Sequence, residues 1–217
     1  MITLRMATLA CLLSGCALIP SQNTREAGLA STALPAPETR ALDSRSAKAL
    51  RIARPVVLRS MTISDLIDTG DEALRVRRFG NGYRVREANG CVWTRIPDWF
   101  APSDSWAACG DSANWHTASA RVEVLDPLFP LEIGATGRYR RAATSFTGKT
   151  STRTTDCTVT GAVTLTTPGG RTTPALVATC SDGRIVRTTW YAPDLGPVAY
   201  REVHDRRGPR QAWVRLD

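Results

Sequence analysis

Four cysteines outside the N-terminal apolar segment are the residues best suited to form covalent links. They are Cys91, Cys109, Cys157 and Cys180. An even number of cysteines is typical of an exported protein with disulfides. A zinc site is disfavoured, because no C-x-x-C spacing occurs and the chain has 2 histidines. We therefore predict two disulfides, no metal and no cofactor.

A hairpin register decides the disulfide pairing. Residues 155–166 and 171–180 are β-prone and flank a four-residue Thr-Pro-Gly-Gly loop. If residue 166 pairs with residue 171, Cys157 lies directly opposite Cys180 and within disulfide reach. Cys91 then pairs with Cys109. Pro174 cannot donate a ladder hydrogen bond, so a bulge or an edge is expected near it.

Four arginines alternate with apolar residues on either side of a Gly-Asn-Gly turn at residues 80–82. They are Arg75, Arg77, Arg84 and Arg86. If the apolar residues face the core, all four guanidinium groups share the outer face, where their geometry suits phosphates and carboxylates. For an exported protein the expected ligand is an anionic envelope component (lipid A, an anionic lipid or peptidoglycan) and not nucleic acid. The alternative is a solvated face that protects an edge strand.

Four tryptophans fall within one 23-residue stretch that largely coincides with the Cys91–Cys109 loop. They are Trp93, Trp99, Trp106 and Trp115. Clustered aromatic residues can line a binding pocket, but they equally fill the core of a small disulfide-closed subdomain. The core interpretation is favoured, and the pocket is the alternative.

Patterns that would support catalysis are sparse. His116 and His204 are the two histidines, and the motifs G-x-S-x-G, H-E-x-x-H and S-x-x-K are absent. Asp98, Asp104 and Asp111 could supply a carboxylate pair, but aspartates in loops are more often turn formers. We predict that the protein is not an enzyme.

Residues 1–16 have the pattern of an export signal. Arg5 precedes a short apolar core at residues 6–13, and the segment ends in Leu13-Ser14-Gly15-Cys16. This ending resembles the lipobox of bacterial lipoproteins. The resemblance implies that residues 1–15 are removed and that Cys16 receives a diacylglycerol thioether and an acylated amine. The alternative is an ordinary secretory signal with a chance cysteine.

Lipidation would fix the protein to a membrane, because two or three acyl chains hold a protein stably. Ala17 follows the cysteine. By analogy with lipoprotein sorting in Gram-negative bacteria, this residue favours the periplasmic face of the outer membrane. The membrane, bound through Cys16, is therefore the expected partner, and the sequence identifies no protein partner.

Residues 16–54 are expected to form a flexible tether. After the first residues the segment is rich in Ala, Ser, Thr, Pro and Arg, it has no aromatic residue, and it contains Leu34-Pro35-Ala36-Pro37. Such a composition buries too little apolar surface to offset the entropy of ordering. A weak basic helix over residues 41–53 that contacts anionic lipids is the alternative to a solvated linker.

The remaining residues, 55–217, have a mainly β pattern. Hydrophobic residues make up 42% of the 217 residues, which excludes wholesale disorder, and no apolar run is long enough for a spanning helix. Apart from a short helix expected over 63–68, segments of period-two alternation recur between Gly/Pro turns, which predicts an antiparallel sandwich or open barrel. A boundary near residue 126 separates a Trp-rich, disulfide-closed β subdomain, 55–126, from an antiparallel β domain, 127–217. The pattern leaves open whether these are one domain or two.

One stretch of the second half resembles uncharacterised exported bacterial β-domains. It reads Trp190-Tyr191-Ala192-Pro193, followed by Gly196 and Val198, and a related phrase, Phe129-Pro130-Leu131, precedes it. The resemblance implies antiparallel sheet and an envelope location, and it carries no catalytic residues.

Together these patterns predict a lipid-anchored envelope protein with a structural or binding role. The net charge of +8, which rests on 26 arginines against 2 lysines, fits contact with anionic surfaces. The alternative is a carrier or chaperone that holds an amphiphile in an apolar concavity of a curved sheet. An enzyme acting on envelope glycans comes third.

Overall fold

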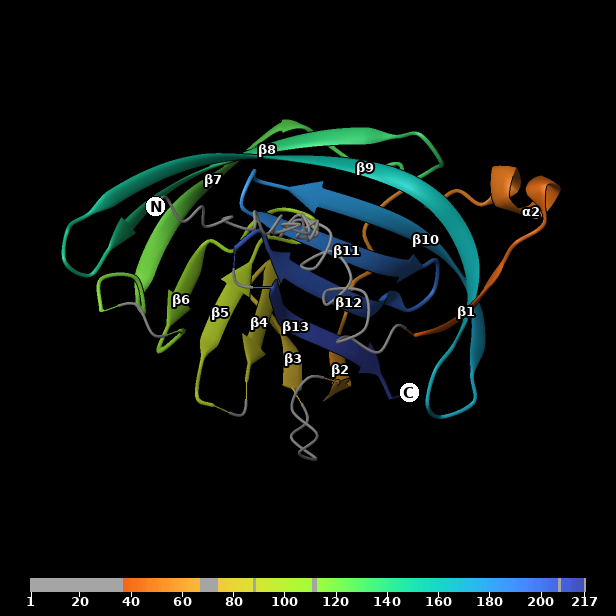
Figure 1. Cartoon of the computed structure of the whole chain (residues 1–217), viewed down its shortest axis with the longest axis horizontal. Helices are drawn as coiled ribbons and strands as arrows, with labels where there is room; N and C mark the ends of the chain where they lie inside the picture. The colour runs from red at the N-terminus through yellow and green to blue at the C-terminus, as the bar shows by residue number, and fades with distance from the viewer. Residues whose placement is uncertain (1–36, 67–73, 88, 111–112, 207, 217) are drawn as a thin grey trace, which may run out of the picture.

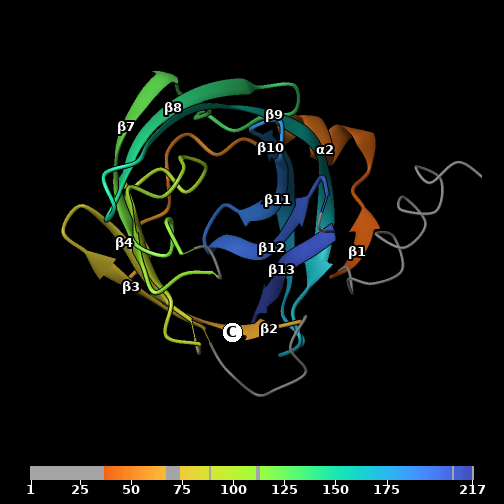
Figure 2. The same cartoon turned by 60° about the vertical axis from the view of Figure 1, so that its left-hand side comes forward.

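Twelve antiparallel strands form a closed barrel in the computed structural model, which describes residues 37–66, 74–87, 89–110, 113–206 and 208–216. The strands are β2 (Ser60–Asp65), β3 (Leu74–Phe79), β4 (Gly82–Arg86), β5 (Val92–Arg95), β6 (Ser105–Ala107), β7 (Ala118–Asp126), β8 (Thr136–Ser145), β9 (Thr150–Thr166), β10 (Thr172–Ser181), β11 (Ile185–Ala192), β12 (Gly196–His204) and β13 (Gly208–Arg215). Each strand pairs with the next along the chain, and β13 pairs with β2 to close the ring (Figures 1 and 2). The predicted mainly β, antiparallel fold is confirmed, and the barrel is closed.

The predicted division near residue 126 does not separate two domains. β7 ends at Asp126 and pairs with β8 across the expected boundary. One core cluster draws on both halves, with Val76, Val85 and Trp99 from the first and Tyr139 and Tyr191 from the second. The two segments therefore fold as one barrel.

The strands alternate between an inward and an outward face, as period-two sequences should. In β8, Gly137, Tyr139, Ala143 and Ser145 are buried while the residues between them are largely exposed. In the β3–β4 hairpin, Gly80 has a φ of 55°, which a glycine adopts without strain. Gly82 is required for a different reason, since a Cβ there would lie 1.9 Å from the carbonyl oxygen of Arg95 on the neighbouring strand.

Successive connections alternate between the two ends of the barrel. One end, here called the plugged end, carries the β3–β4, β5–β6, β7–β8, β9–β10 and β11–β12 connections. The β5–β6 and β7–β8 loops fill it, because Trp99, Leu128 and Leu131 are fully buried there. The Val56 backbone N–H donates to the Tyr191 hydroxyl at 2.8 Å, and the Tyr83 hydroxyl donates to the Val56 carbonyl at 2.9 Å. The opposite end is called the mouth.

Part of the expected tether is ordered. β1 (Glu38–Ala41) pairs with residues 163–166 of β9, and α2 (Ser44–Ala49) follows with Asp43 as its N-cap. Ile52 is buried and bridges to Leu131. Burial of this residue and pairing along β9 offset the ordering entropy that the composition alone cannot. The tether prediction is therefore wrong for residues 37–54, and residues 16–36 lie outside the described residues.

The expected short helix over 63–68 is also wrong where it can be compared. Residues 60–65 form β2, which pairs with β3 on one edge and with β13 on the other. Across the described parts of the chain, no helix is long and apolar enough to span a membrane.

A second core lies on the outer side of the last strands. Trp213 and Tyr200 belong to the interior cluster, while their neighbours Val214 and Ala199 belong to a separate cluster. Residues adjacent in a strand point to opposite faces. Leu165 and Ala175 of the β9–β10 hairpin join this second cluster, so the hairpin covers the outer face of β12 and β13.

Candidate functional site

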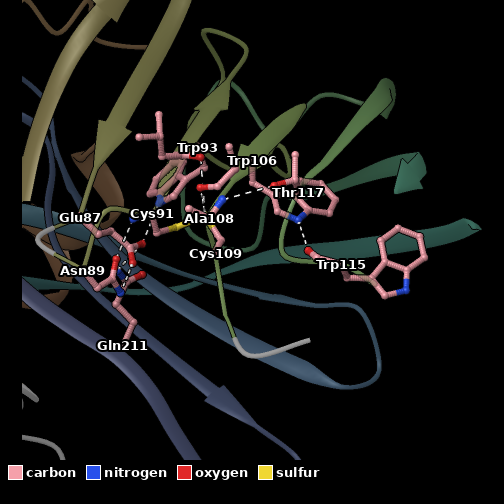
Figure 3. Close-up of a disulfide and its surroundings, with 12 residues drawn as sticks. Glu87, Asn89, Cys91, Trp93, Trp106, Ala108, Cys109, Trp115, Thr117 and Gln211 are labelled. Carbon is pink, nitrogen blue, oxygen red and sulfur yellow. Dashed lines mark hydrogen bonds between the residues drawn. A yellow bond between two sulfur atoms is a disulfide. The ribbon is translucent and has the colours of Figure 1, made fainter. Parts of the chain in front are cut away.

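Both predicted disulfides are present. Cys91 and Cys109 are bonded with their Cα atoms 4.5 Å apart, and Cys157 and Cys180 with theirs 4.0 Å apart. Figure 3 shows the first bridge beside Trp93 and Trp106. The second joins directly paired residues of β9 and β10. These bridges fix the strands and do not themselves form a site.

The four arginines of the β3–β4 hairpin lie on the outer surface, as expected. Val76, Tyr83 and Val85 are buried between them. The register places Arg75 opposite Arg86 and Arg77 opposite Arg84. We call these four residues the arginine face.

The arginine face has no acidic partner among the described residues, none of which forms a salt bridge with it. Like charges directly opposite each other on a sheet repel. The guanidinium of Arg84 instead lies 3.6 Å from the centroid of the Phe79 ring, and Phe79 is 48% exposed. A shallow depression of about 340 Å³ adjoins Arg75 and Arg77 and is lined by the hydroxyl residues Ser60 and Thr62. An exposed aromatic ring therefore lies within a positively charged surface that has no acidic partner among the described residues.

The four tryptophans do not come together as a pocket. Trp99 is buried in the core and contacts Trp93 and Trp213 edge-on. Trp106 donates from Nε1 to the Trp115 carbonyl at 2.6 Å, and Figure 3 shows the Trp115 indole pointing away from the other labelled residues. A depression of about 510 Å³ on the outside of β5–β8 is lined by Trp106 alone among the four. The structure thus favours the core interpretation for Trp99 and Trp93.

The two histidines lie near the mouth without a shared partner. The His116 ring packs on Phe146 at 4.4 Å between centroids, and His204 contacts Asp205 in the β12–β13 turn at 2.8 Å. No group of three or more His, Cys, Asp or Glu side chains among the described residues is placed to hold a metal.

A second group of arginines, which the sequence analysis missed, lines the mouth of the barrel. This mouth cluster consists of Arg95, Arg141, Arg153, Asp182, Arg187, Tyr200, Glu202 and Arg210. Arg141 follows the buried Tyr139 by two residues and Glu202 follows the buried Tyr200 by two, so both occupy inward positions. The signal present in the sequence was an arginine at a position that the regular period-two alternation places on the inward face of its strand.

Two carboxylates form the ion pairs of the mouth cluster. Glu202 accepts from Tyr200 at 2.7 Å and pairs with Arg187 and Arg210, each at 3.1 Å. Asp182, whose side chain is 2% exposed, lies 3.7 Å from Arg153 and 3.8 Å from Arg187. Burial would raise the pKa of both carboxyls, but Arg187 and the other arginines outweigh it and hold each pKa below its usual value.

Arg141 and Arg95 form no direct ion pair with a carboxylate among the described residues. At longer range Asp182 acts on Arg141, and Glu202 and Asp98 act on Arg95. The Arg141 guanidinium lies 5.1 Å from the Trp106 ring, and burial, followed by the charge of Arg187, lowers the pKa of Arg141 to about 10. Arg95 is 8% exposed, and it donates to the Trp99 carbonyl and contacts the Trp93 ring. Its Nε is buried without a hydrogen-bond partner. Positive charge therefore exceeds negative charge inside the mouth.

Comparison with known proteins identifies no family for this chain: no protein-family model, no curated protein and no solved structure matches it significantly. Its function has to be inferred from these two arginine clusters and from the N-terminal motif.

Proposed function

We propose that this protein is a lipid-anchored, non-catalytic binding protein on the periplasmic face of the outer membrane, and that its arginine face binds anionic lipid headgroups. The observation that carries the proposal is the exposed Phe79 beneath the Arg84 guanidinium, within a surface of four arginines that lack an acidic partner among the described residues. Guanidinium groups pair well with phosphate, and an adjacent exposed ring can enter the headgroup layer.

The distribution of exposed apolar residues supports an orientation with the plugged end toward the membrane. Most of the large exposed apolar side chains among the described residues lie at that end: Val57, Phe79, Val124, Leu125, Ile133 and Leu216. Residues 37–58, which follow the expected anchor, also cross this end through the Ile52–Leu131 bridge. A membrane anchored through Cys16 would then meet Phe79 and the arginine face together.

The filled interior favours surface binding over the alternative of an amphiphile carrier. A carrier needs an apolar space inside the barrel, and Trp99, Tyr139, Tyr191 and Trp213 occupy the described interior. An enzyme acting on envelope glycans stays the third candidate, without a supporting arrangement of side chains among the described residues.

Vesicle binding tests the headgroup proposal. The mature chain, residues 16–217 with Cys16→Ser to remove the anchor, is mixed with vesicles of phosphatidylglycerol or of phosphatidylcholine and sedimented. We expect binding to the anionic vesicles only, and loss of most of it in the variant Arg75→Gln/Arg77→Gln/Arg84→Gln/Arg86→Gln, since each arginine near an anionic surface contributes about 1 kcal/mol. The matched control replaces four other exposed arginines that lie outside the plugged end: Arg121, Arg140, Arg184 and Arg206.

Two outcomes would reject parts of the proposal. Equal loss of binding in the control variant would mean that net charge, and not the arginine face, drives association. A Cys16→Ser chain that stays in the membrane fraction of cells, even after a salt wash that releases electrostatically bound protein, would mean that Cys16 is not the anchor.

A further inference from the structure

The mouth cluster has more positive charge than its own carboxylates neutralise. Five guanidinium groups face two carboxylates at ion-pair distance, and each carboxylate already contacts at least two arginines. A third carboxylate, Asp98, accepts from the Tyr139 hydroxyl at 2.7 Å and acts on Arg95 only at longer range. Glu87 lies near Trp93, but its carboxylate accepts from the Trp93 indole at 2.9 Å and from Gln211 at 3.3 Å. The cluster therefore holds a formal excess of positive charge in a partly buried place.

Arg141 and Arg153 are adjacent within this cluster. They are directly paired residues on β8 and β9, and both side chains occupy the inward face. Arg153 retains 28% side-chain exposure and Arg141 is half-buried, so both can be reached through the mouth. Asp182 contacts Arg153 from one side, while Arg141 lies against the Trp106 ring and interacts with Asp182 only at longer range.

A buried positive charge without a counter-ion is unfavourable, because the interior solvates it poorly. Burial and the neighbouring charge of Arg187 lower the pKa of Arg141, and the attraction of Asp182 does not offset them. The unpaired Nε of Arg95 adds a second donor that the protein itself does not satisfy. An anion with several oxygen acceptors beside Arg141 would remove the first of these costs.

We propose that the mouth of the barrel binds an oxyanion of the phosphate class, held chiefly by Arg141 and Arg153. Planar guanidinium forks match the geometry of phosphate oxygens, and paired arginines on neighbouring strands can each give two hydrogen bonds. The site lies at the end opposite most of the exposed apolar residues and opposite Phe79, so it is separate from the proposed headgroup contact. The bound group is either free phosphate or the phosphate of a soluble ester.

Titration with inorganic phosphate tests the proposal on the mature Cys16→Ser chain. Thermal unfolding and calorimetry are run in a phosphate-free buffer, with sodium chloride at equal ionic strength as the blank. We expect saturable binding and a higher melting temperature with phosphate. In Arg141→Gln the affinity should fall by about tenfold or more, the effect of losing a charge-assisted pair.

Arg141→Gln has a second expected effect that a merely structural arginine would not show. Without phosphate, the variant should melt at the same or a higher temperature than the parent chain, because repulsion from Arg187 and Arg153 is relieved. Arg153→Gln should lose phosphate binding but also melt lower, because Asp182 loses a partner. Arg75→Gln on the outer surface is the matched control and should bind phosphate normally.

Each outcome of the phosphate titration either supports or overturns the proposal. No saturable effect of phosphate on the parent chain, or an equal effect on Arg141→Gln, would overturn the proposal. Tighter binding of glycerol 1-phosphate than of inorganic phosphate would identify a phosphate ester as the ligand, and the reverse order would identify free phosphate. Vesicle binding should be unchanged in Arg141→Gln, so failure here and failure of the headgroup proposal are distinguishable.

Discussion

The arginine face and the mouth cluster use the same residue type in opposite ways. On the face, Arg75, Arg77, Arg84 and Arg86 are exposed and have no acidic partner among the described residues, so water and salt screen their mutual repulsion. In the mouth, the side chains of Arg187 and Glu202 are 15% and 13% exposed, and each contact between them is correspondingly strong. Charge on the face should therefore govern association, whereas charge in the mouth should also govern stability.

The largest expected effect comes from removing a carboxylate of the mouth. Glu202→Gln leaves Arg187, Arg210 and Tyr200 without their shared negative charge and with one acceptor oxygen fewer. Breaking a buried ion pair from one side costs about 3–5 kcal/mol of unfolding free energy. Urea unfolding measures it. Glu123→Gln, which breaks an exposed pair with Arg140, is the control and should cost at most about 1 kcal/mol. Equal losses of unfolding free energy in the two variants would contradict the expected difference between buried and exposed ion pairs.

The disulfide beside the mouth should have the next largest effect. Cys157 and Cys180 lie one residue pair from the Asp156–Ser181 end of the β9–β10 ladder, close to Arg153 and Asp182. Cys157→Ala/Cys180→Ala should lower the unfolding free energy by about 2–4 kcal/mol, mainly through a less restricted unfolded chain. Phosphate affinity should fall with it, while vesicle binding at low temperature should not. Weakened vesicle binding would show that the two regions are coupled.

Lowering the pH should reduce the stability that the mouth cluster contributes before it changes the charge of the arginine face. The pKa of Glu202 lies below its usual 4.5, so the unfolded chain binds its proton more readily than the folded chain does. The stability that Glu202 contributes is complete above pH 4.5 and is lost as the pH falls through its folded pKa. Unfolding free energies measured from pH 6 down to about pH 3 should decline, and more steeply than in Glu202→Gln. Parallel profiles for the two chains would contradict this assignment.

The smallest expected effect is on the face. Arg75→Gln removes one of two like-charged cross-strand pairs and should raise stability by about 0.5 kcal/mol at low salt. The gain should disappear in high salt, because screening already suppresses the repulsion. Thermal unfolding at two salt concentrations measures it. A loss of stability at low salt would mean that Arg75 has a favourable partner, and the surface would not be free for lipid.

In the β9–β10 hairpin, local sequence patterns predict the disulfide pairing but not the register at the turn. The predicted pairing of Cys157 with Cys180 is correct, but the turn pairs Thr166 with Thr172 and not with residue 171. A bulge between Val177 and Ala178 absorbs the one-residue difference before the cysteines. A bulge near Pro174 was expected from its missing N–H, yet its position depends on how the hairpin bends across the outer face of β12 and β13.

The two segments whose secondary structure was predicted wrongly have one cause in common. β2 and β1 are strands because edges of other strands are available to pair with them. Neither edge is visible in the local sequence, since β13 and β9 come from distant parts of the chain. The mouth cluster was missed because its parts come from separate hairpins. Arg187 pairs with Glu202 on β11 and β12, and Arg141 with Arg153 on β8 and β9, and only the curved barrel brings the two pairs together around Asp182.

The sequence by itself determined the mainly β class, the outward-facing arginines and both disulfides, because alternation, turns and cysteine spacing are local properties with period two. It also contains Leu13-Ser14-Gly15-Cys16, whose resemblance to a lipobox is the basis of the anchoring proposal. Tertiary structure alone decided the closure of the barrel, the ordering of residues 37–54 and the assembly of the mouth cluster. Those features depend on contacts between residues far apart in the chain, whose free energy exists only when the whole barrel has formed.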